Sequence, residues 1–199
     1  MAPPHADGFR TFLQNLTMLH ELYSRSFRTR FGLFRIWASS RGLYALEFGE
    51  VRRQYEETKK LLPSVSSLLK RTESSLKRYL SGKRTGFKGL PIDWSDYPAF
   101  ERGVLQELQK IKRGSQASYQ FLARRAGRPR AVRYVGKILG KNRLPILIPC
   151  HRIVRKDGGL GGFSKGLGWK KRLLKLERAY VDTKSRVKAG RLTGPSGVL

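Results

Sequence analysis

The sequence predicts an α+β protein of two domains, a small sheet domain followed by a mostly helical one. Three stretches predict it: a hairpin pattern in the first half, a helix-turn-helix pattern in the second, and a glycine-rich basic segment, "SGKRTGFKGLPIDWSDYP", between them. We expect an amino-terminal domain over residues 1–95, a second domain over 96–180 and a basic tail over 181–199.

The first half begins with apolar residues at helical spacing, which predict an amphipathic helix over residues 9–28. In "FGLFRIWASSRGLYALEFGE" two β-prone runs flank a Ser-Ser-Arg-Gly turn signal, so a hairpin follows. A charged helical segment over 50–62 should end at Pro63, because proline interrupts a helix. A further helix over 66–80 aligns Leu69, Leu76 and Leu80 on one side.

The second half opens with a predicted helix over 98–112 whose inward stripe holds Phe100, Val104, Leu108 and Ile111. A short helix should then begin at Ser118 as its N-cap and stop at Gly127. The next helix would carry Pro129 in its first turn. Helix, tight glycine-containing turn and helix form a helix-turn-helix pattern.

The second helix of this pattern has two contrasting faces when it is projected at about 100° per residue. Val132, Val135 and Leu139 fall on one face, which should pack against the domain. The opposite face is basic, and with the helix-turn-helix context it favours contact with nucleic acid over an ordinary solvated surface. Its residues are Arg130, Arg133, Tyr134, Lys137 and Lys141.

The last part of the chain reads as strand, loop and helix. "ILIP" predicts a short buried strand that leads to Cys150, and a glycine-rich loop follows it. The segment "WKKRLLKLERAY" predicts a final helix with Leu173, Leu174 and Leu176 inward. The tail after Tyr180 has few large apolar residues, so we expect it to be mobile.

The chain is strongly basic: 42 Lys and Arg against 14 Asp and Glu give a formal net charge of +28. Such a balance favours a polyanionic partner, and nucleic acid above others, because clustered cations release counterions from phosphates. Solubility or adaptation to heat is the alternative reading of the charge. The chain shows no stretch that could span a membrane and no secretory signal pattern, so we expect a cytoplasmic, nucleoid-associated protein, or a nuclear one in a eukaryote.

The single cysteine, Cys150, lies in "LPILIPCHRIV". An isolated cysteine is usually a small buried hydrophobe. A reactive thiol, whose reference pKa is about 8.5, needs a base or a positive field beside it, and His151 and Arg152 are candidates. Glu177 is one of few carboxylates in this half that could orient the imidazole. One cysteine permits no internal disulfide, and no metal-ligand spacing appears, so we expect neither metal nor cofactor.

The segment "NRLPILIPCHRIVRKDGGLGGFSKGLGWKKRLLKLE" resembles the active-site segment of the O6-alkylguanine-DNA alkyltransferases, whose hallmark is Pro-Cys-His-Arg after an apolar run. The similarity extends upstream through "SYQFLARRAG" and "RAVRYVG" and covers about residues 100–177, and more weakly the first half. It implies a ribonuclease-H-like first domain and a winged helix-turn-helix second domain.

The resemblance also implies a role for each matching residue. Cys150 would accept the alkyl group from guanine O6 in a single turnover, with His151 as base through a water and Glu177 as its orienter. Asn142 would hold the active-site turn, and Tyr119 would donate a proton towards guanine N3. Lys170 would lie near the O6 side. The base pocket would be lined by Ile153, Gly161, Phe163 and Ser164.

The implied partner is double-stranded DNA with the damaged base flipped out, which costs a few kcal/mol. Arg133 matches the arginine that fills the vacated space. The expected DNA contacts are Arg128, Arg130, Arg133, Tyr134, Lys137 and Arg152. Tyr134 and Val132 stand where small residues are usual in the family, and Arg143 replaces a common proline. We expect a monomer, with cooperative loading along DNA left open.

Three other functions fit parts of the sequence. A non-catalytic sensor of alkylated DNA, or another DNA-binding regulator, explains the basic helix, but such sensors lack the cysteine. A basic RNA-associated protein explains the charge and leaves Pro-Cys-His-Arg unexplained. A cysteine hydrolase would turn over many times, and the chain has no peptidase signature.

Overall fold

The computed structural model describes residues 22–49 and 62–178, in two compact units that divide between Trp94 and Ser95. Each unit is described by itself. Residues 9–21 of the helix expected over 9–28, residues 50–61 of the helical segment expected over 50–62, and the tail over 181–199 lie outside the described residues. Among those described, no helix is long and apolar enough to cross a bilayer.

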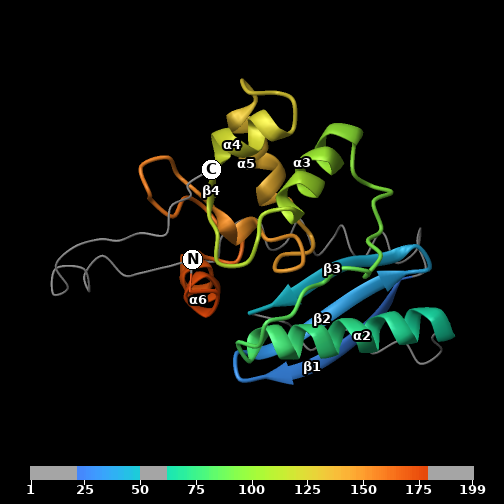
Figure 1. Ribbon diagram of the computed structural model, residues 1–199. Helices are drawn as coiled ribbons and strands as arrows, with labels where there is room; N and C mark the ends of the chain where they lie inside the picture. The colour runs from blue at the N-terminus through green and yellow to red at the C-terminus, as the bar shows by residue number, and fades with distance from the viewer. Residues whose placement is uncertain (1–21, 50–61, 179–199) are drawn as a thin grey trace, which may run out of the picture. The chain divides into compact units, whose positions relative to one another are not determined.

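The first unit is a three-stranded antiparallel sheet with a helix against it (Figure 1). Strands β2 (Gly32–Ser39) and β3 (Gly42–Phe48) form the predicted hairpin. Strand β1 (Tyr23–Thr29) adds to the outer edge of β2. Phe27, Phe34 and Phe48 stack across the three strands, with ring centroids 5.6 Å and 5.2 Å apart.

The prediction that a helix extends to Arg28 was wrong. Residues 23–28 pair with β2 instead, from Tyr23 opposite Ala38 to Arg28 opposite Leu33. Backbone pairing along a free strand edge and the stacking of Phe27 on Phe34 outweigh the weak helical periodicity there.

Helix α2 (Pro63–Leu80) covers one face of this sheet (Figure 1). Leu69, Leu76 and Leu80 are buried, as their spacing predicts. Pro63 is the first residue of α2, where the missing N–H costs nothing because the first N–H groups of a helix have no partner inside it.

The segment after α2 pairs with β3 at the edge of the sheet. Leu43 donates its N–H to the Pro91 carbonyl at 2.8 Å, and Asp93 donates its N–H to the Leu43 carbonyl at 2.9 Å. The Asp93 carboxylate, 2% exposed, accepts from the Ser39 hydroxyl at 2.5 Å. Gly42, at φ 146°, lets Pro91 come close, since a Cβ there would lie 2.8 Å from the proline carbonyl carbon.

The second unit is mostly helical: α3 (Ala99–Gln109), α4 (Tyr119–Arg125), α5 (Val132–Gly140) and α6 (Leu167–Leu176). Strands β4 (Ala117–Ser118) and β5 (Ile153–Val154) pair in parallel and join the start of α4 to the segment after a short 3-10 turn, η1 (Cys150–Arg152). Val104 and Leu108 of α3 are buried, whereas Phe100 and Ile111 are only partly buried.

The helix-turn-helix pattern is present with a shifted second helix. The Ser118 hydroxyl caps α4 by accepting from the Phe121 N–H at 3.0 Å, and Gly127 follows α4 at φ 77°. Pro129 was expected in the first turn of the next helix, but α5 begins at Val132, with Pro129 and Arg130 in the turn before it. In α6, Leu173 and Leu174 are buried and Leu176 only partly so.

The strand expected at "ILIP" does not form. Residues 144–148 are buried, but Pro145 and Ile148 make only an isolated bridge around a tight turn, and Ile146 takes a φ of 78°. Proline offers no N–H for a ladder, so Pro145 and Pro149 favour a turn over a strand.

Gly42→Ala should lower the free energy of unfolding by about 2–4 kcal/mol, because the added Cβ meets the Pro91 backbone as well as the unfavourable φ. Gly32→Ala is the matched control: Gly32 has φ 110° and nothing within 4 Å of an added Cβ, so only the conformational cost of about 1 kcal/mol applies. Urea denaturation of both variants measures the difference, and equal losses would show that the Pro91 contact is not tight.

Candidate functional site

The site is built on the tight turn before Cys150, and Asn142 holds that turn together. Asn142 follows α5 by two residues. Its side chain donates from Nδ2 to the Ile148 carbonyl at 2.8 Å and accepts at Oδ1 from the Leu144 N–H at 3.0 Å. The same Nδ2 lies 3.1 Å from Cys150 Sγ. One buried amide therefore fixes both the turn and the thiol.

The Cys150 thiol is buried, at 5% exposure. Burial raises its pKa to about 11, while the hydrogen bond from Asn142 and the nearby Lys170 charge act in the opposite direction. The resting group is therefore a neutral thiol, and its chemistry needs a group that removes the proton.

His151 meets Glu177 across the unit, as the sequence predicted. Nε2 of His151 lies 3.0 Å from Glu177 Oε1, and both side chains have no exposed surface. Burial lowers the pKa of His151, only partly offset by Glu177, so the imidazole is neutral at pH 7. Since the carboxylate accepts from Nε2, Nδ1 is the nitrogen that can take up a proton.

Arg152 completes this arrangement, which the sequence did not indicate. Its guanidinium donates to both carboxylate oxygens of Glu177, from Nε at 2.9 Å and Nη2 at 2.7 Å, and from Nη1 to the Ile111 carbonyl at 2.6 Å. Burial alone would raise the pKa of Glu177, but the hydrogen bonds and charges of His151 and Arg152 hold it well below its ordinary range.

The expectation that Arg152 contacts DNA is therefore wrong for this structure. The side chain is 10% exposed and is turned inward to a buried carboxylate, where it cannot also meet a phosphate. A basic residue next to a histidine gives no signal in the sequence that tells an inward ion pair from an outward contact.

Lys170 is fully buried, and its ammonium is hydrogen-bonded to the glycine-rich loop that follows β5. Its ammonium donates to the carbonyls of Ile153 at 2.6 Å, Gly162 at 3.2 Å and Leu160. Burial lowers the pKa of Lys170 to about 8, and the Cys150 charge acts against that shift. The predicted pocket residue Ile153 thus contributes a carbonyl that anchors Lys170, while its side chain is buried.

Tyr119, the first residue of α4, lies beside the same loop. A Cβ on Gly161, which has φ 64°, would come within 2.9 Å of the Tyr119 hydroxyl, so the two residues are neighbours. Burial raises the pKa of Tyr119, and the charge of Cys150 adds to this, so the phenol keeps its proton. Further along the loop Phe163 is partly buried and Ser164 is exposed.

The basic face of α5 is exposed as predicted. Arg133, Tyr134 and Lys137 of α5 are exposed, as are Arg128, Arg130 and Lys141 beside it. On the predicted packing face Val135 and Leu139 are buried, whereas Val132 is only partly buried. Tyr134 does not project freely: its ring stacks on Phe100 at 5.9 Å between centroids, and its hydroxyl donates to Glu101 at 2.9 Å. The Tyr134 side chain therefore packs against α3.

Arg143, next to Asn142, makes a second buried support that sequence reasoning missed. Its guanidinium donates to Asp96 at 2.7 Å and lies over the Tyr97 ring at 4.4 Å. The arginine is 7% exposed, and its backbone N–H donates to the Tyr97 hydroxyl at 3.3 Å. The segment before α3 thereby braces the turn that carries Asn142.

Together these groups can support a single nucleophilic substitution. Glu177 holds the imidazole of His151, and Asn142 holds the thiol of the neighbouring Cys150, so the site contains the groups of an orienter, a base and a nucleophile. Lys170 and Asn142 favour a thiolate once it forms. Within the described residues, no three His, Cys, Asp or Glu side chains gather as metal ligands.

Comparison with known proteins gives two family matches. Residues 18–94 match the model described as "6-O-methylguanine DNA methyltransferase, ribonuclease-like domain", and residues 99–179 match "6-O-methylguanine DNA methyltransferase, DNA binding domain".

Individual relatives agree with the family models. A methylated-DNA–protein-cysteine methyltransferase of Methanopyrus kandleri is 43% identical over 55% of this chain and 83% of its own length. One of Haemophilus influenzae is 40% identical over 54% of this chain, and the match spans 60% of that relative. The crystal structure of Mycobacterium tuberculosis OGT in complex with DNA superposes with a TM-score of 0.66 at 27% identity, covering 78% of this chain and 92% of that one.

Glu177→Gln should make the second unit less stable at neutral pH and less sensitive to acid. A carboxyl whose pKa is lower in the folded than in the unfolded chain stabilises the fold above about pH 4.3 and loses that contribution as pH falls towards its folded pKa. The wild type should therefore lose stability between about pH 5 and pH 2, and the variant should lose less over that range. At pH 7 we expect a loss of about 3 kcal/mol, because Arg152 keeps a buried charge without its carboxylate.

Thermal unfolding across pH measures this effect. Glu107→Gln is the control, since Glu107 pairs with Lys110 and Arg125 at the surface and should change stability by less than about 1 kcal/mol. A Glu177→Gln variant with the wild-type pH profile would contradict the buried ion pair.

Proposed function

The chain belongs to the methylated-DNA–protein-cysteine methyltransferase family, and on this premise we propose that it repairs DNA by moving an alkyl group from guanine O6 to Cys150. The observation that carries the proposal is that two buried hydrogen-bonded pairs, Asn142 with Cys150 and Glu177 with His151, meet at adjacent residues of one turn. A sensor of alkylated DNA has no use for a nucleophile, whereas this site holds one beside a base and its orienter.

The reaction is a substitution at the alkyl carbon. A water takes the Cys150 thiol proton and passes one to Nδ1 of His151, while Glu177 and Arg152 hold the ring in place. The thiolate forms a bond from Sγ to the alkyl carbon as the bond from that carbon to guanine O6 breaks. Tyr119 gives its phenol proton to guanine N3, which neutralises the leaving base.

Two further groups position the reacting atoms. Asn142 keeps Sγ in place and stabilises its charge by a hydrogen bond. Lys170 fixes three carbonyls around the base pocket and lowers the pKa of Cys150 through its charge. The pocket itself is formed by the loop of Gly161, Phe163 and Ser164 with the Ile153 backbone.

The product is a thioether, and no residue in the mechanism regenerates the thiol. Each molecule therefore acts once, and the reaction needs no cofactor. The proposed substrate is double-stranded DNA, which the protein meets as a monomer in the cytoplasm or, in a eukaryote, in the nucleus. The second domain, 96–180, carries both the chemistry and the DNA-binding surface of α5 and the turn before it, on which Arg128, Arg130, Arg133, Tyr134 and Lys137 contact the duplex. Arg133 occupies the space that the flipped guanine leaves.

Incubation with a duplex carrying one O6-methylguanine should add the mass of one methylene to the protein. Intact-protein mass spectrometry measures it, with an undamaged duplex and the Cys150→Ser variant as controls. The gain should appear only with the lesion and only with Cys150. A folded protein that binds the lesion duplex and gains no mass would favour the sensor of alkylated DNA.

Arg133→Ala should slow repair of the duplex by at least tenfold and leave transfer from free O6-benzylguanine within about twofold of wild type. The reason is that a free base needs no flipping, and the arginine is exposed on α5, outside the reacting groups. Single-turnover rates on the two substrates separate these effects. An equal fall in rate on both substrates would contradict a role of Arg133 in base flipping.

A further inference from the structure

The solvent face of α2 in the first unit has an unusual composition. From Ser64 to the C-cap Ser81, every exposed residue is serine, lysine or arginine. We call this set the α2 basic face. Its members are Ser64, Ser67, Lys70, Arg71, Ser74, Lys77, Arg78 and Ser81.

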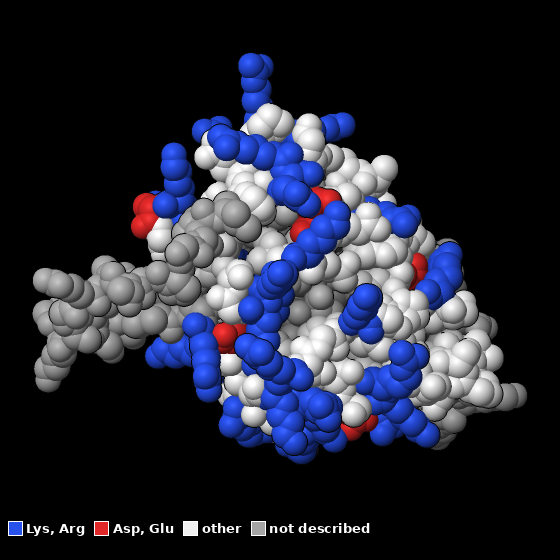
Figure 2. All heavy atoms as spheres, in the orientation of Figure 1, with Lys and Arg blue, Asp and Glu red and all other residues white. Residues whose placement is uncertain are grey.

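Helical geometry gathers these side chains on one surface. At about 100° per residue they fall within an arc of about 140°. The cations form two pairs, Lys70 with Arg71 and Lys77 with Arg78, one heptad apart, which is about 10 Å along the helix axis. Figure 2 shows lysine and arginine side chains gathered over the region where Figure 1 places α2.

The face has almost no negative charge of its own. The one carboxylate of α2, Glu73, is at the edge, with its side chain 13% exposed. It is already engaged by Arg25 at 2.5 Å and Lys77 at 2.7 Å. Among the described residues no carboxylate pairs with Lys70, Arg71 or Arg78, and Arg71 instead donates to the Gly89 carbonyl at 3.3 Å.

Helix α3 shows the ordinary pattern by contrast. There Glu107 is shared by Lys110 and Arg125, so the surface charges are mixed and neutralise one another. On the α2 basic face only Lys77 has a carboxylate partner in the described part of the chain, so the repulsion among its clustered cations opposes folding slightly. Such a cluster of cations is suited to binding a partner that carries negative charges.

The chemistry of the face matches a phosphodiester backbone. Lysine, arginine and serine are the side chains that commonly contact phosphates, and short serines allow the backbone to approach the helix. A lipid surface fits less well: a helix that lies on a membrane inserts its apolar side, whereas Leu69 and Leu76 of α2 are completely buried in the first unit.

We propose that the α2 basic face binds the backbone of DNA as a second nucleic-acid surface, separate from α5 and without preference for sequence or damage. It shares its partner class with the proposed function but does not depend on alkyl transfer. Two weak surfaces in one chain raise the effective concentration of each for the same DNA.

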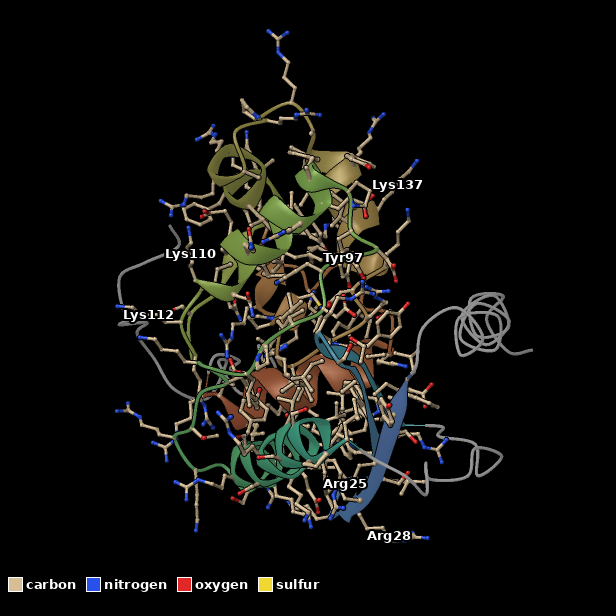
Figure 3. All side chains as sticks on the ribbon, turned by 90° about the vertical axis from the view of Figure 1, so that its right-hand side faces the viewer. Arg25, Arg28, Tyr97, Lys110, Lys112 and Lys137 are labelled. Atoms are coloured by element: carbon tan, nitrogen blue, oxygen red, sulfur yellow. The ribbon has the colours of Figure 1, made fainter. Side chains whose placement is uncertain are left out.

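The test compares two triple variants of the full chain with the same change in net charge. Lys70→Gln, Arg71→Gln and Arg78→Gln remove the α2 basic face and spare Lys77, which pairs with Glu73. The control carries Arg28→Gln, Lys112→Gln and Lys156→Gln, all exposed and off this face. Figure 3 shows Arg28 and Lys112 pointing outward.

Affinity for a long undamaged duplex should fall at least tenfold in the α2 variant and less than threefold in the control, measured by fluorescence anisotropy over a range of salt concentrations. The slope of log K against log salt should fall by about 2–3 in the α2 variant, at about 0.9 per lost phosphate contact. Equal weakening in the two variants would overturn the proposal, because it would reduce the effect to net charge.

Three further measurements keep the result interpretable. Thermal unfolding shows whether both triple variants are folded. If loss of the hydrogen bond from Arg71 to Gly89 unfolds the α2 variant, the double variant Lys70→Gln, Arg78→Gln takes its place. Binding to phosphatidylserine vesicles or to an RNA hairpin that depends on the α2 face, with DNA affinity unchanged, would overturn DNA as the partner. Transfer from free O6-benzylguanine should equal wild type, and its absence in every protein would sink the proposed function while leaving the α2 comparison valid.

Discussion

The second unit depends on the buried contacts that the Glu177 carboxylate makes with His151 and Arg152. This carboxylate satisfies a histidine and an arginine at once, and through the Ile111 carbonyl that arginine reaches back to the segment after α3. Removing Glu177 or Arg152 alone would leave the other as an unpaired buried charge, which would cost several kcal/mol of folding free energy. The two residues should therefore be kept or lost together. The orientation of His151 therefore follows from the same network that holds α6 and η1 together.

The surroundings of Cys150 reconcile two opposing demands. Burial keeps the thiol protonated and protects it from general reaction with oxidants or electrophiles. Asn142 and Lys170 supply the stabilisation that a thiolate needs when a substrate excludes water. Reactivity is thus a property of the assembled complex more than of the free protein, which fits a reagent that is used once.

The sequence was sufficient for the parts of the structure that follow local rules. The hairpin, the Ser118 cap and the two faces of α5 came from periodicity and turn chemistry, and the meeting of His151 with Glu177 came from the family resemblance. Strand β1 was missed although its pairing is local: it forms a tight hairpin with β2, closed between Thr29 and Gly32, and the helical spacing of the residues before it concealed this. The inward turn of Arg152 and the brace on Arg143 were equally hidden, since both are set by partners remote in the chain.

The Arg143 brace also restricts how the sequence can vary. Asp96 and Tyr97 are joined to Arg143 by a short ion pair and a ring contact, and the arginine is almost completely buried. Loss of the aspartate would leave a buried guanidinium without its carboxylate, whereas Asp96 is exposed to solvent and would be hydrated without the arginine. Relatives that carry an arginine at position 143 should therefore keep an acidic residue at 96 and an aromatic ring at 97, whereas relatives without that arginine are free to vary at both positions.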